Sequence, residues 1–115
     1  MKIYTYKNCD TCRKALNWLD AQGIEYEQKA IRESPPTIKE LKSMLATYRG
    51  EIRKLFNTSG RDYKTLNLKD QLPNMTPSEA FSLLAKNGNL IKRPFLLAGN
   101  INLVGFNDKE WSEKL

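Results

Sequence analysis

The residues best suited to chemistry are two cysteines, Cys9 and Cys12, the only cysteines in a chain that has no histidine. Cys9 is therefore the one evident nucleophile. It stands where a predicted short strand, Lys2 to Tyr6, gives way to an amphipathic helix. Unpaired backbone N–H groups and the positive end of a helix dipole favour a thiolate at such a place. Thiols there ionise with pKa values of roughly 3.5–7.5 instead of about 8.5, so we predict a reactive sulfur.

Each cysteine also has a structural interpretation. Cys9 could be a small buried hydrophobic residue, although its polar neighbours Asn8 and Asp10 argue against deep burial. Cys12 falls on the apolar stripe of the helix, where it is either a half-buried structural residue or a resolving thiol that closes a disulfide on Cys9. Arg13 either adds positive charge beside Cys9 or points into solvent. We take Asn8 and Arg13 as candidate substrate-binding residues.

Size and composition bound the class of protein. The 115 residues are enough for one domain, residues 1–115, with a real hydrophobic core. The shares of hydrophobic residues, 40%, and of charged residues, 28%, are ordinary for a soluble globular protein. No apolar run approaches the roughly 20 residues of a membrane span. The chain opens directly on a strand, which leaves no room for a signal peptide, so we expect a cytoplasmic protein that does not bind membranes.

Cysteine and charge usage narrow the chemistry further. A structural zinc site needs about four N or S ligands, so two thiols without an imidazole argue against a zinc site within the chain but leave open one shared between two chains. A single C-x-x-C in a cytosolic chain is typical of redox proteins. The net charge of +6 fits either a solvated surface or an anionic partner, such as glutathione, an oxyanion or an acidic protein patch. No dense basic run or nucleic-acid-binding motif is present, so we expect no direct nucleic-acid binding.

The residues after the first helix predict a second strand. Ile24, Tyr26 and Ala30 alternate with polar residues, which indicates a half-buried strand. A right-handed crossover makes this strand the parallel neighbour of the first one. The cysteines then lie at the carboxyl end of the first strand, where open α/β sheets bind ligands.

The rest of the chain completes an α/β fold. Capping boxes at Thr37–Glu40 and Thr76–Glu79 predict that residues 37 to about 88 are mostly helical. Two apolar runs, 95–98 and 101–104, are joined by a Gly-Asn loop and predict a hairpin, which a final helix follows. The order βαβ, helical insertion, ββα predicts a four-stranded mixed sheet.

Pro94 is the second informative residue because it stands just before the third predicted strand. It either starts that strand or forms a cis Arg93–Pro94 bond that places Arg93 against the thiolate. Arg93 would then hold an oxyanion or a glutathione carboxylate through a forked contact, with Pro94 as a further candidate substrate-binding residue. The segment 57–60 either forms a loop over the same cleft or simply ends a helix.

Four blocks carry a family resemblance: YTYKNCDTCRKALNWL (Tyr4–Leu19), LFNTSGRDYKTLNL (Leu55–Leu68), LIKRPFLL (Leu90–Leu97) and NLVGF (Asn102–Phe106). In this order, and over nearly the whole chain, they resemble the arsenate reductase (ArsC)/Spx family. The resemblance implies a thioredoxin-like fold with a helical insertion. It maps the family's reactive cysteine onto Cys9, and its arginine and cis-proline onto Arg93 and Pro94.

The chain departs from the arsenate reductases of this family at named positions. The glutathione- and glutaredoxin-dependent enzymes use three arginines around the cysteine. Only Arg93 is matched here, and Asn57 and Gly105 stand at the other two places. The loss of two arginines removes hydrogen-bond donors worth about 1.5–3 kcal/mol each to a charged oxyanion, so we do not expect efficient arsenate reduction. Those enzymes also lack a cysteine at the position of Cys12, whereas Spx-type proteins carry the full C-x-x-C.

These observations favour a cytoplasmic thiol–disulfide oxidoreductase that holds no bound cofactor. Cys9 attacks a small anionic or protein disulfide, Cys12 resolves the mixed disulfide, and Arg93 with the helix N-terminus stabilises the anion. The resemblance implies glutathione or a thioredoxin/glutaredoxin-type protein as the electron donor.

Two alternatives stay open. The first is an Spx-like redox regulator that binds the RNA polymerase α subunit. The intact C-x-x-C favours it, but the chain ends right after the last predicted helix, where Spx proteins continue. The second is a structural or adaptor domain without catalysis, for which loss of the Cys9 thiol would change no phenotype.

Overall fold

A computed structural model describes the whole chain, residues 1–115. The elements follow in the order β1 (Lys2–Thr5), α1 (Asp10–Ala21), β2 (Glu27–Ala30), α2 (Ile38–Thr47), the 3-10 helix η1 (Ile52–Leu55), α3 (Arg61–Thr65), α4 (Leu68–Gln71), η2 (Leu72–Asn74), α5 (Pro77–Lys86), η3 (Gly88–Leu90), β3 (Phe95–Ala98), β4 (Ile101–Val104) and α6 (Asp108–Lys114). Helices therefore fill the chain between β2 and β3, as the capping boxes predict.

The four strands form one mixed sheet in the order β2-β1-β3-β4. β1 pairs with β2 in parallel and with β3 antiparallel, and β3 pairs with β4 as a hairpin. The α/β fold class and the four-stranded mixed sheet expected from the sequence are confirmed. Tyr4 pairs with Phe95, so the turn at Pro94 lies beside the carboxyl end of β1.

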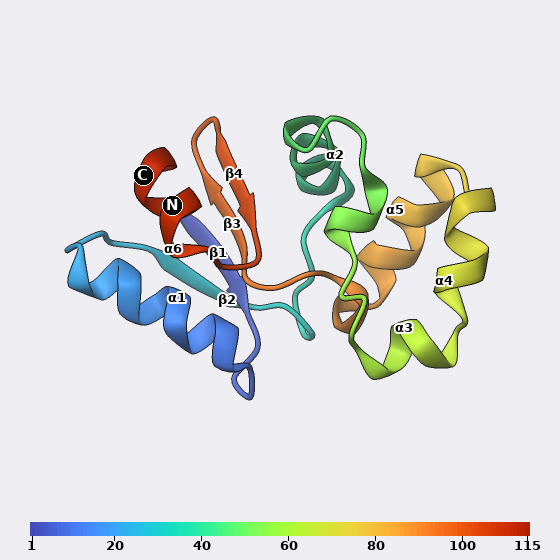
Figure 1. Cartoon of the computed structure of the whole chain (residues 1–115), viewed down its shortest axis with the longest axis horizontal. Coiled ribbons are helices and arrows are strands. Elements are labelled where there is room, and N and C mark those ends of the chain that lie inside the picture. The colour runs from blue at the N-terminus through green and yellow to red at the C-terminus, as the bar shows by residue number, and fades with distance from the viewer.

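Side chains alternate between the two faces of the sheet, and each face has its own hydrophobic cluster. One cluster joins the strands to α1 and α6: Ile3, Ala15, Leu19, Leu96, Leu103 and Trp111. The other, larger cluster includes Tyr4 and Phe95 and joins the opposite face to the helices between β2 and β3. Figure 1 shows this arrangement, with α1 and α6 on one side of the sheet and α2 to α5 on the other.

The prediction for the second strand was wrong in where the strand begins and in the burial of Ala30, whereas its parallel pairing with the first strand is confirmed. β2 begins only at Glu27, so Ile24 and Tyr26 precede it, and within it only Lys29 is partly buried while Ala30 is exposed. The physical reason is that β2 is an edge strand, paired on one side only, where polar side chains keep the edge solvated.

Local signals set both ends of α1. Cys9 is its N-cap, and at the other end the amides of Gly23 and Ile24 donate to the carbonyls of Asp20 and Leu19. This pattern is a Schellman motif, which needs a left-handed residue, and Gly23 provides it with φ of 69°. The helix therefore starts at the cysteine pair for reasons contained in the sequence itself.

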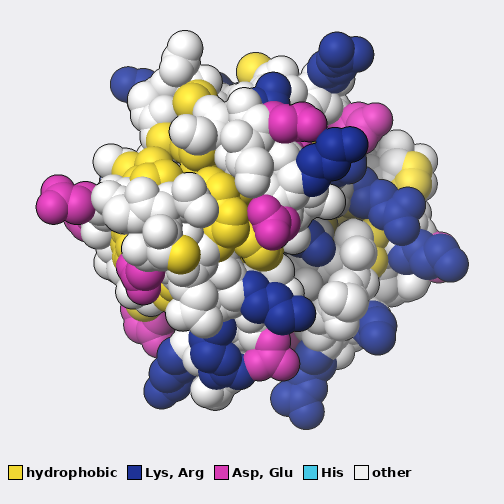
Figure 2. Space-filling model, turned by 60° about the vertical axis from the view of Figure 1, so that its left-hand side comes forward, with side chains coloured by type: hydrophobic (Ala, Val, Ile, Leu, Met, Phe, Trp, Pro, Cys, Tyr) yellow, Lys and Arg dark blue, Asp and Glu magenta, His cyan; other side chains and the backbone are white.

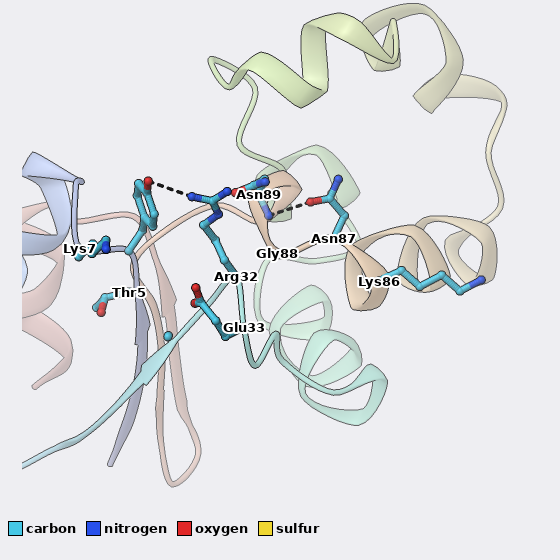
Figure 3. Close-up of a pocket in the computed structure, with 10 residues that line it drawn as sticks. Thr5, Lys7, Arg32, Glu33, Lys86, Asn87, Gly88 and Asn89 are labelled. Carbon is cyan, nitrogen blue, oxygen red and sulfur yellow. Dashed lines mark hydrogen bonds between the residues drawn. The ribbon is translucent and has the colours of Figure 1, made fainter.

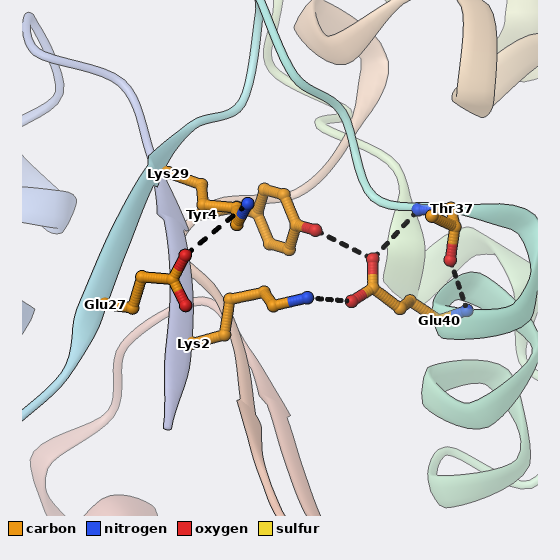
Figure 4. A network of polar contacts seen from close by, with 6 residues as sticks. All are labelled: Lys2, Tyr4, Glu27, Lys29, Thr37 and Glu40. Atoms are coloured by element: carbon orange, nitrogen blue, oxygen red, sulfur yellow. Dashed lines mark hydrogen bonds and ion pairs between the residues drawn. The ribbon is translucent and has the colours of Figure 1, made fainter.

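The capping box of α2 also docks this helix onto the sheet. Thr37 and Glu40 form the predicted box, and the Glu40 carboxylate accepts hydrogen bonds from Lys2 Nζ at 2.8 Å and from the Tyr4 hydroxyl at 2.7 Å. Figure 4 shows this network between β1 and α2. Burial opposes ionisation of Glu40, but the bonds from Lys2, the Thr37 amide and Tyr4 outweigh it and lower its pKa.

The surface mixes the two signs of charge. Figure 2 shows a face on which a band of hydrophobic side chains is bordered by Lys and Arg residues with Asp and Glu among them. The aromatic rings of Trp18 and Phe106, which pack beside Trp111, are partly buried contributors to the cluster around α1 and α6. No helix of the structure has the length and apolar character needed to cross a bilayer.

Candidate active site

Cys9 lies at the first turn of α1 with its side chain partly exposed to solvent. Its backbone is extended, and its Sγ accepts a hydrogen bond from the Cys12 amide over 3.3 Å. The sulfur therefore takes the place that a serine or aspartate oxygen occupies in an ordinary N-cap. Because free N–H groups and the helix dipole stabilise an anion at this point, the geometry suits a thiolate.

Cys12 lies one turn further along and is buried, with 1% of its surface exposed. Burial, and next the hydrogen bond with Cys9, raise the pKa of the Cys12 thiol to about 12. A backbone hydrogen bond from Tyr6 and the positive charge of Arg93 act in the opposite direction. The two thiols thus differ sharply: one is accessible at a helix terminus, and the other is a buried, protonated neighbour.

The Arg93–Pro94 bond is cis, as the second interpretation of Pro94 predicted, while a contact of Arg93 with the Cys9 thiolate stays a prediction. The turn brings Arg93 over the ring of Tyr6, with 5.0 Å between the guanidinium carbon and the ring centre. Nη1 of Arg93 is buried and has no hydrogen-bond partner in the protein. A buried guanidinium nitrogen without an acceptor is a strong potential donor to an anion.

Tyr6 is a residue that the sequence interpretation missed. Its hydroxyl accepts hydrogen bonds from Asn8 Nδ2 at 3.4 Å and from Arg32 Nη1 at 3.0 Å, and its carbonyl accepts the Cys9 amide at 3.2 Å. The hydrogen bond from Asn8 is the largest cause of a lowered Tyr6 pKa; desolvation comes next and opposes it, and the charge of Arg32 and its hydrogen bond lower the pKa further. Tyr6 therefore joins the cysteine turn to two arginines.

The other predicted substrate-binding residues lie around the same turn. Asn8 is exposed and bonds to Tyr6, as described. Arg13 is also exposed and forms an ion pair with Asp10, while its Nη1 donates to the Lys7 carbonyl at 3.3 Å. Much of the Arg13 charge is thus compensated locally, and a role for it in binding substrate stays a prediction.

Asn57 and Gly105 stand where arsenate reductases are expected to have arginines. The Asn57 amide donates to the Leu90 carbonyl at 2.7 Å, so this segment lies along the chain that leads to Arg93. Gly105 has φ of 68°, and a Cβ there would lie 3.1 Å from Cε of Lys92. Residues with a side chain rarely adopt this backbone conformation, so an arginine at position 105 would be strained.

A polar cleft of about 560 Å³ opens at the carboxyl ends of β1 and β2. We call it the strand-end cleft. Its walls are the end of β1 with Tyr6 and Lys7, the end of β2 with Arg32 and Glu33, and the segment 86–89. Figure 3 shows Arg32 and Glu33 between the β1 wall on one side and the Asn87–Asn89 wall on the other.

Sequence reasoning predicted a ligand site at this edge of the sheet but did not identify these side chains. The available signal was the general rule that residues just beyond the ends of parallel strands converge. Tyr6 directly follows β1, and Arg32 comes two residues after the end of β2. The same rule, applied to the ends of both strands, predicts that Tyr6 and Arg32 lie close together.

This sheet order, with a cysteine pair at the start of the first helix and a cis-proline before the third strand, defines a thioredoxin-like protein. The chain belongs to the ArsC family, whose match extends over residues 4–114. The family predicted from the four sequence blocks is therefore confirmed.

Individual relatives match this chain over almost its full length. YusI of Bacillus subtilis strain 168 is 42% identical over 98% of this chain and 96% of its own. The regulatory protein MgsR of the same organism is 32% identical over 96% of this chain and 86% of its own. The crystal structure of an ArsC family related protein from Bacteroides fragilis superimposes with a TM-score of 0.92 at 41% identity, covering 99% and 96% of the two chains.

Proposed function

We propose that this protein is a thiol–disulfide oxidoreductase in which Cys9 is the nucleophile and Cys12 the resolving thiol. The observation that carries the proposal is the contrast between the two sulfurs. Cys9 is accessible and receives an amide hydrogen bond at the N-terminus of α1, whereas Cys12 is buried directly behind it. A cytoplasmic setting supplies the thiol donors that keep such a pair reduced.

The reaction begins when the Cys9 thiolate attacks one sulfur of a disulfide substrate. A new bond forms between Cys9 Sγ and that sulfur, the substrate S–S bond breaks, and the second sulfur leaves as a thiolate that takes a proton from solvent. In this proposal the buried Nη1 of Arg93, which has no partner in the protein, and the first-turn amides of α1 stabilise negative charge during this exchange.

Resolution uses the buried thiol. Burial, the largest cause of the raised Cys12 pKa, remains once Cys9 is in a mixed disulfide, but the hydrogen bond and the negative charge of Cys9, which also raise it, are lost. The Tyr6 backbone and Arg93 still lower the Cys12 pKa. Cys12 then releases its proton and attacks Cys9 Sγ, which closes the Cys9–Cys12 disulfide and expels the substrate thiol. Two electrons have passed to the substrate, and two thiols of glutathione or of a donor protein restore the cysteines.

The test is turnover of glutathione mixed disulfides, protein disulfides and arsenate, measured with purified protein and glutathione as donor. We expect turnover of at least one disulfide substrate, none with Cys9→Ser, and accumulation of a covalent mixed disulfide with Cys12→Ser, seen by intact-mass spectrometry. Arsenate should be the poorest substrate because Asn57 and Gly105 replace two arginines. Full activity of Cys9→Ser would overturn the proposal.

The 32% identity to the regulatory protein MgsR favours a second candidate, a redox-sensing regulator that binds RNA polymerase. In that case the Cys9–Cys12 disulfide would alter a binding surface instead of serving turnover. Pull-down with the RNA polymerase α subunit, in reduced and in oxidised buffer, separates the two functions. Absence of binding in both forms would remove the regulator.

A further inference from the structure

We propose that the strand-end cleft binds the carboxylate of a small disulfide substrate while its sulfur reacts at Cys9. This inference rests on the proposed function and adds the chemical class of the substrate. At about 560 Å³ the cleft has the size of a small-molecule site. Only two of its ten lining residues are hydrophobic, so it suits a polar ligand and not an apolar one.

The charges of the cleft define the sign of the ligand. Lys7, Arg32 and Lys86 line it, against a single carboxylate, Glu33. The ion pairs of the protein are Lys2–Glu40, Arg13–Asp10 and Lys29–Glu27, so none of the charged groups of the cleft has an ion-pair partner. The cleft therefore has an excess of uncompensated positive charge, which attracts an anionic group.

The wall opposite Arg32 is fixed by hydrogen bonds that the ligand need not supply. The side chains of Asn87 and Asn89 donate to the same Asp62 oxygen at 3.1 and 3.3 Å, and Asn87 Oδ1 accepts the Asn89 amide at 3.0 Å. Between them, Gly88 packs so closely on the end of β2 that a Cβ would lie 1.9 Å from the Ile31 carbonyl oxygen. The cleft thus keeps its shape without a ligand, and a preformed site lowers the ordering cost of binding.

Tyr6 connects this cleft to the reacting sulfur. It is part of the cleft wall, its carbonyl holds the Cys9 amide, and the guanidinium carbons of Arg32 and Arg93 each lie 5.0 Å from its ring centre. Arg32 uses one nitrogen for the Tyr6 hydroxyl, which leaves its other N–H groups for a carboxylate. In this proposal, therefore, a molecule whose sulfur meets Cys9 has its carboxylate beside Arg32.

The kinetic test compares three symmetrical disulfides: 3,3′-dithiodipropionate, which is anionic, 2-hydroxyethyl disulfide, which is neutral, and cystamine, which is cationic. The second-order rate constant of the reduced protein with each disulfide is divided by the rate constant of free 2-mercaptoethanol with the same disulfide. This ratio removes differences in the intrinsic reactivity of the three disulfides. We expect the order anionic, neutral, cationic for the protein. Because the cations are exposed, Arg32→Gln should lower the anionic-to-neutral ratio by about twofold to fivefold. Lys86→Gln should lower it by less, since Figure 3 shows the Lys86 side chain directed away from Arg32.

The neutral probe keeps this inference separate from the proposed function. Arg32→Gln and Lys86→Gln should lower the rate with the anionic disulfide more than the rate with 2-hydroxyethyl disulfide. Lys109→Gln, an equal charge change at an exposed position on α6 outside the cleft, should leave both the neutral rate and the ratio unchanged. No reaction of the wild-type protein with the neutral probe would contradict the proposed function. A normal neutral rate without any anionic preference, or an equal effect of Lys109→Gln, would overturn the cleft assignment.

A binding measurement tests the cleft without any reaction. Suberate has the carbon-chain length of 3,3′-dithiodipropionate but no sulfur, and it can be titrated into the Cys9→Ser protein. We expect amide shift changes by NMR in residues 5–7, 30–33 and 86–89, and their loss in the Arg32→Gln/Lys86→Gln double variant. Shift changes spread over the surface, or unchanged by the double variant, would contradict the proposal.

Discussion

The guanidinium carbon of Arg93 lies 5.0 Å from the centre of the Tyr6 ring. The same tyrosine carries the carbonyl that accepts the Cys9 amide. A single aromatic side chain therefore supports the cation of the Arg93–Pro94 turn and borders the turn that holds the nucleophile. Loss of the Tyr6 ring should therefore affect the chemistry at Cys9 through the position of Arg93.

Replacing the ring of Tyr6 should lower the reaction rate of Cys9 more than removing the Tyr6 hydroxyl does. Tyr6→Leu loses a cation–π contact worth about 0.5–1 kcal/mol, so we expect the rate with 2-hydroxyethyl disulfide to fall about twofold to fivefold. Tyr6→Phe keeps the ring and should react at nearly the wild-type rate. Equal rates for the two variants would show that the ring does not position Arg93.

The two cysteines should differ in alkylation by iodoacetamide. Burial, the largest cause of the raised Cys12 pKa, persists in the Cys9→Ser protein, so at pH 8 Cys12 is mostly a thiol there, and this protein should react more than about tenfold slower than Cys12→Ser protein. Below that pKa the Cys12 rate should rise about tenfold for each pH unit, because the thiolate fraction does. Similar rates for the two variants at pH 8 would contradict the assignment of roles.

The Glu40 network should stabilise the fold in a pH-dependent way. Glu40→Gln keeps a side chain that can complete the capping box but removes the charge that Lys2 and Tyr4 contact, so we expect a loss of about 1–2 kcal/mol in the free energy of unfolding at pH 7. The folded-state pKa of Glu40 lies below its ordinary value of 4.5, so this stabilisation is present above pH 4.5 and is lost as the pH falls through the lowered value.

Urea unfolding at pH 7 and at pH 3 measures the difference. The matched control is Glu79→Gln, which alters the same kind of capping box on α5, where the carboxylate contacts only Thr76. We expect a smaller loss for this control. A difference between wild type and Glu40→Gln that is the same at both pH values would exclude a contribution from the charge.

Gly88 should not tolerate a side chain. A Cβ at this position would lie 1.9 Å from the Ile31 carbonyl oxygen, which is backbone and cannot rotate away. We expect Gly88→Ala to lower the free energy of unfolding by about 1–3 kcal/mol and to open the strand-end cleft. Ser78→Ala, an exposed change on α5, should stay within about 0.5 kcal/mol in the same urea titration.

The elements that the sequence predicted well are those whose signals are local. The boxes at Thr37–Glu40 and Thr76–Glu79 and the Gly99 turn of the hairpin all form as expected. In each case the interacting groups are only a few residues apart, so no distant segment needs to be known. The one strand predicted poorly was β2, because its exposure depends on which strands neighbour it.

The amino-acid pattern alone determined that a cysteine begins the first helix and that a proline precedes the third strand, because both follow from the order of residues along the chain. Only the tertiary structure decided that Cys12 is buried while Cys9 is accessible, and that Tyr6 meets both Arg32 and Arg93. These relationships join segments far apart in sequence. They depend on how the sheet orders its strands and how helices cover its faces, which no local signal encodes.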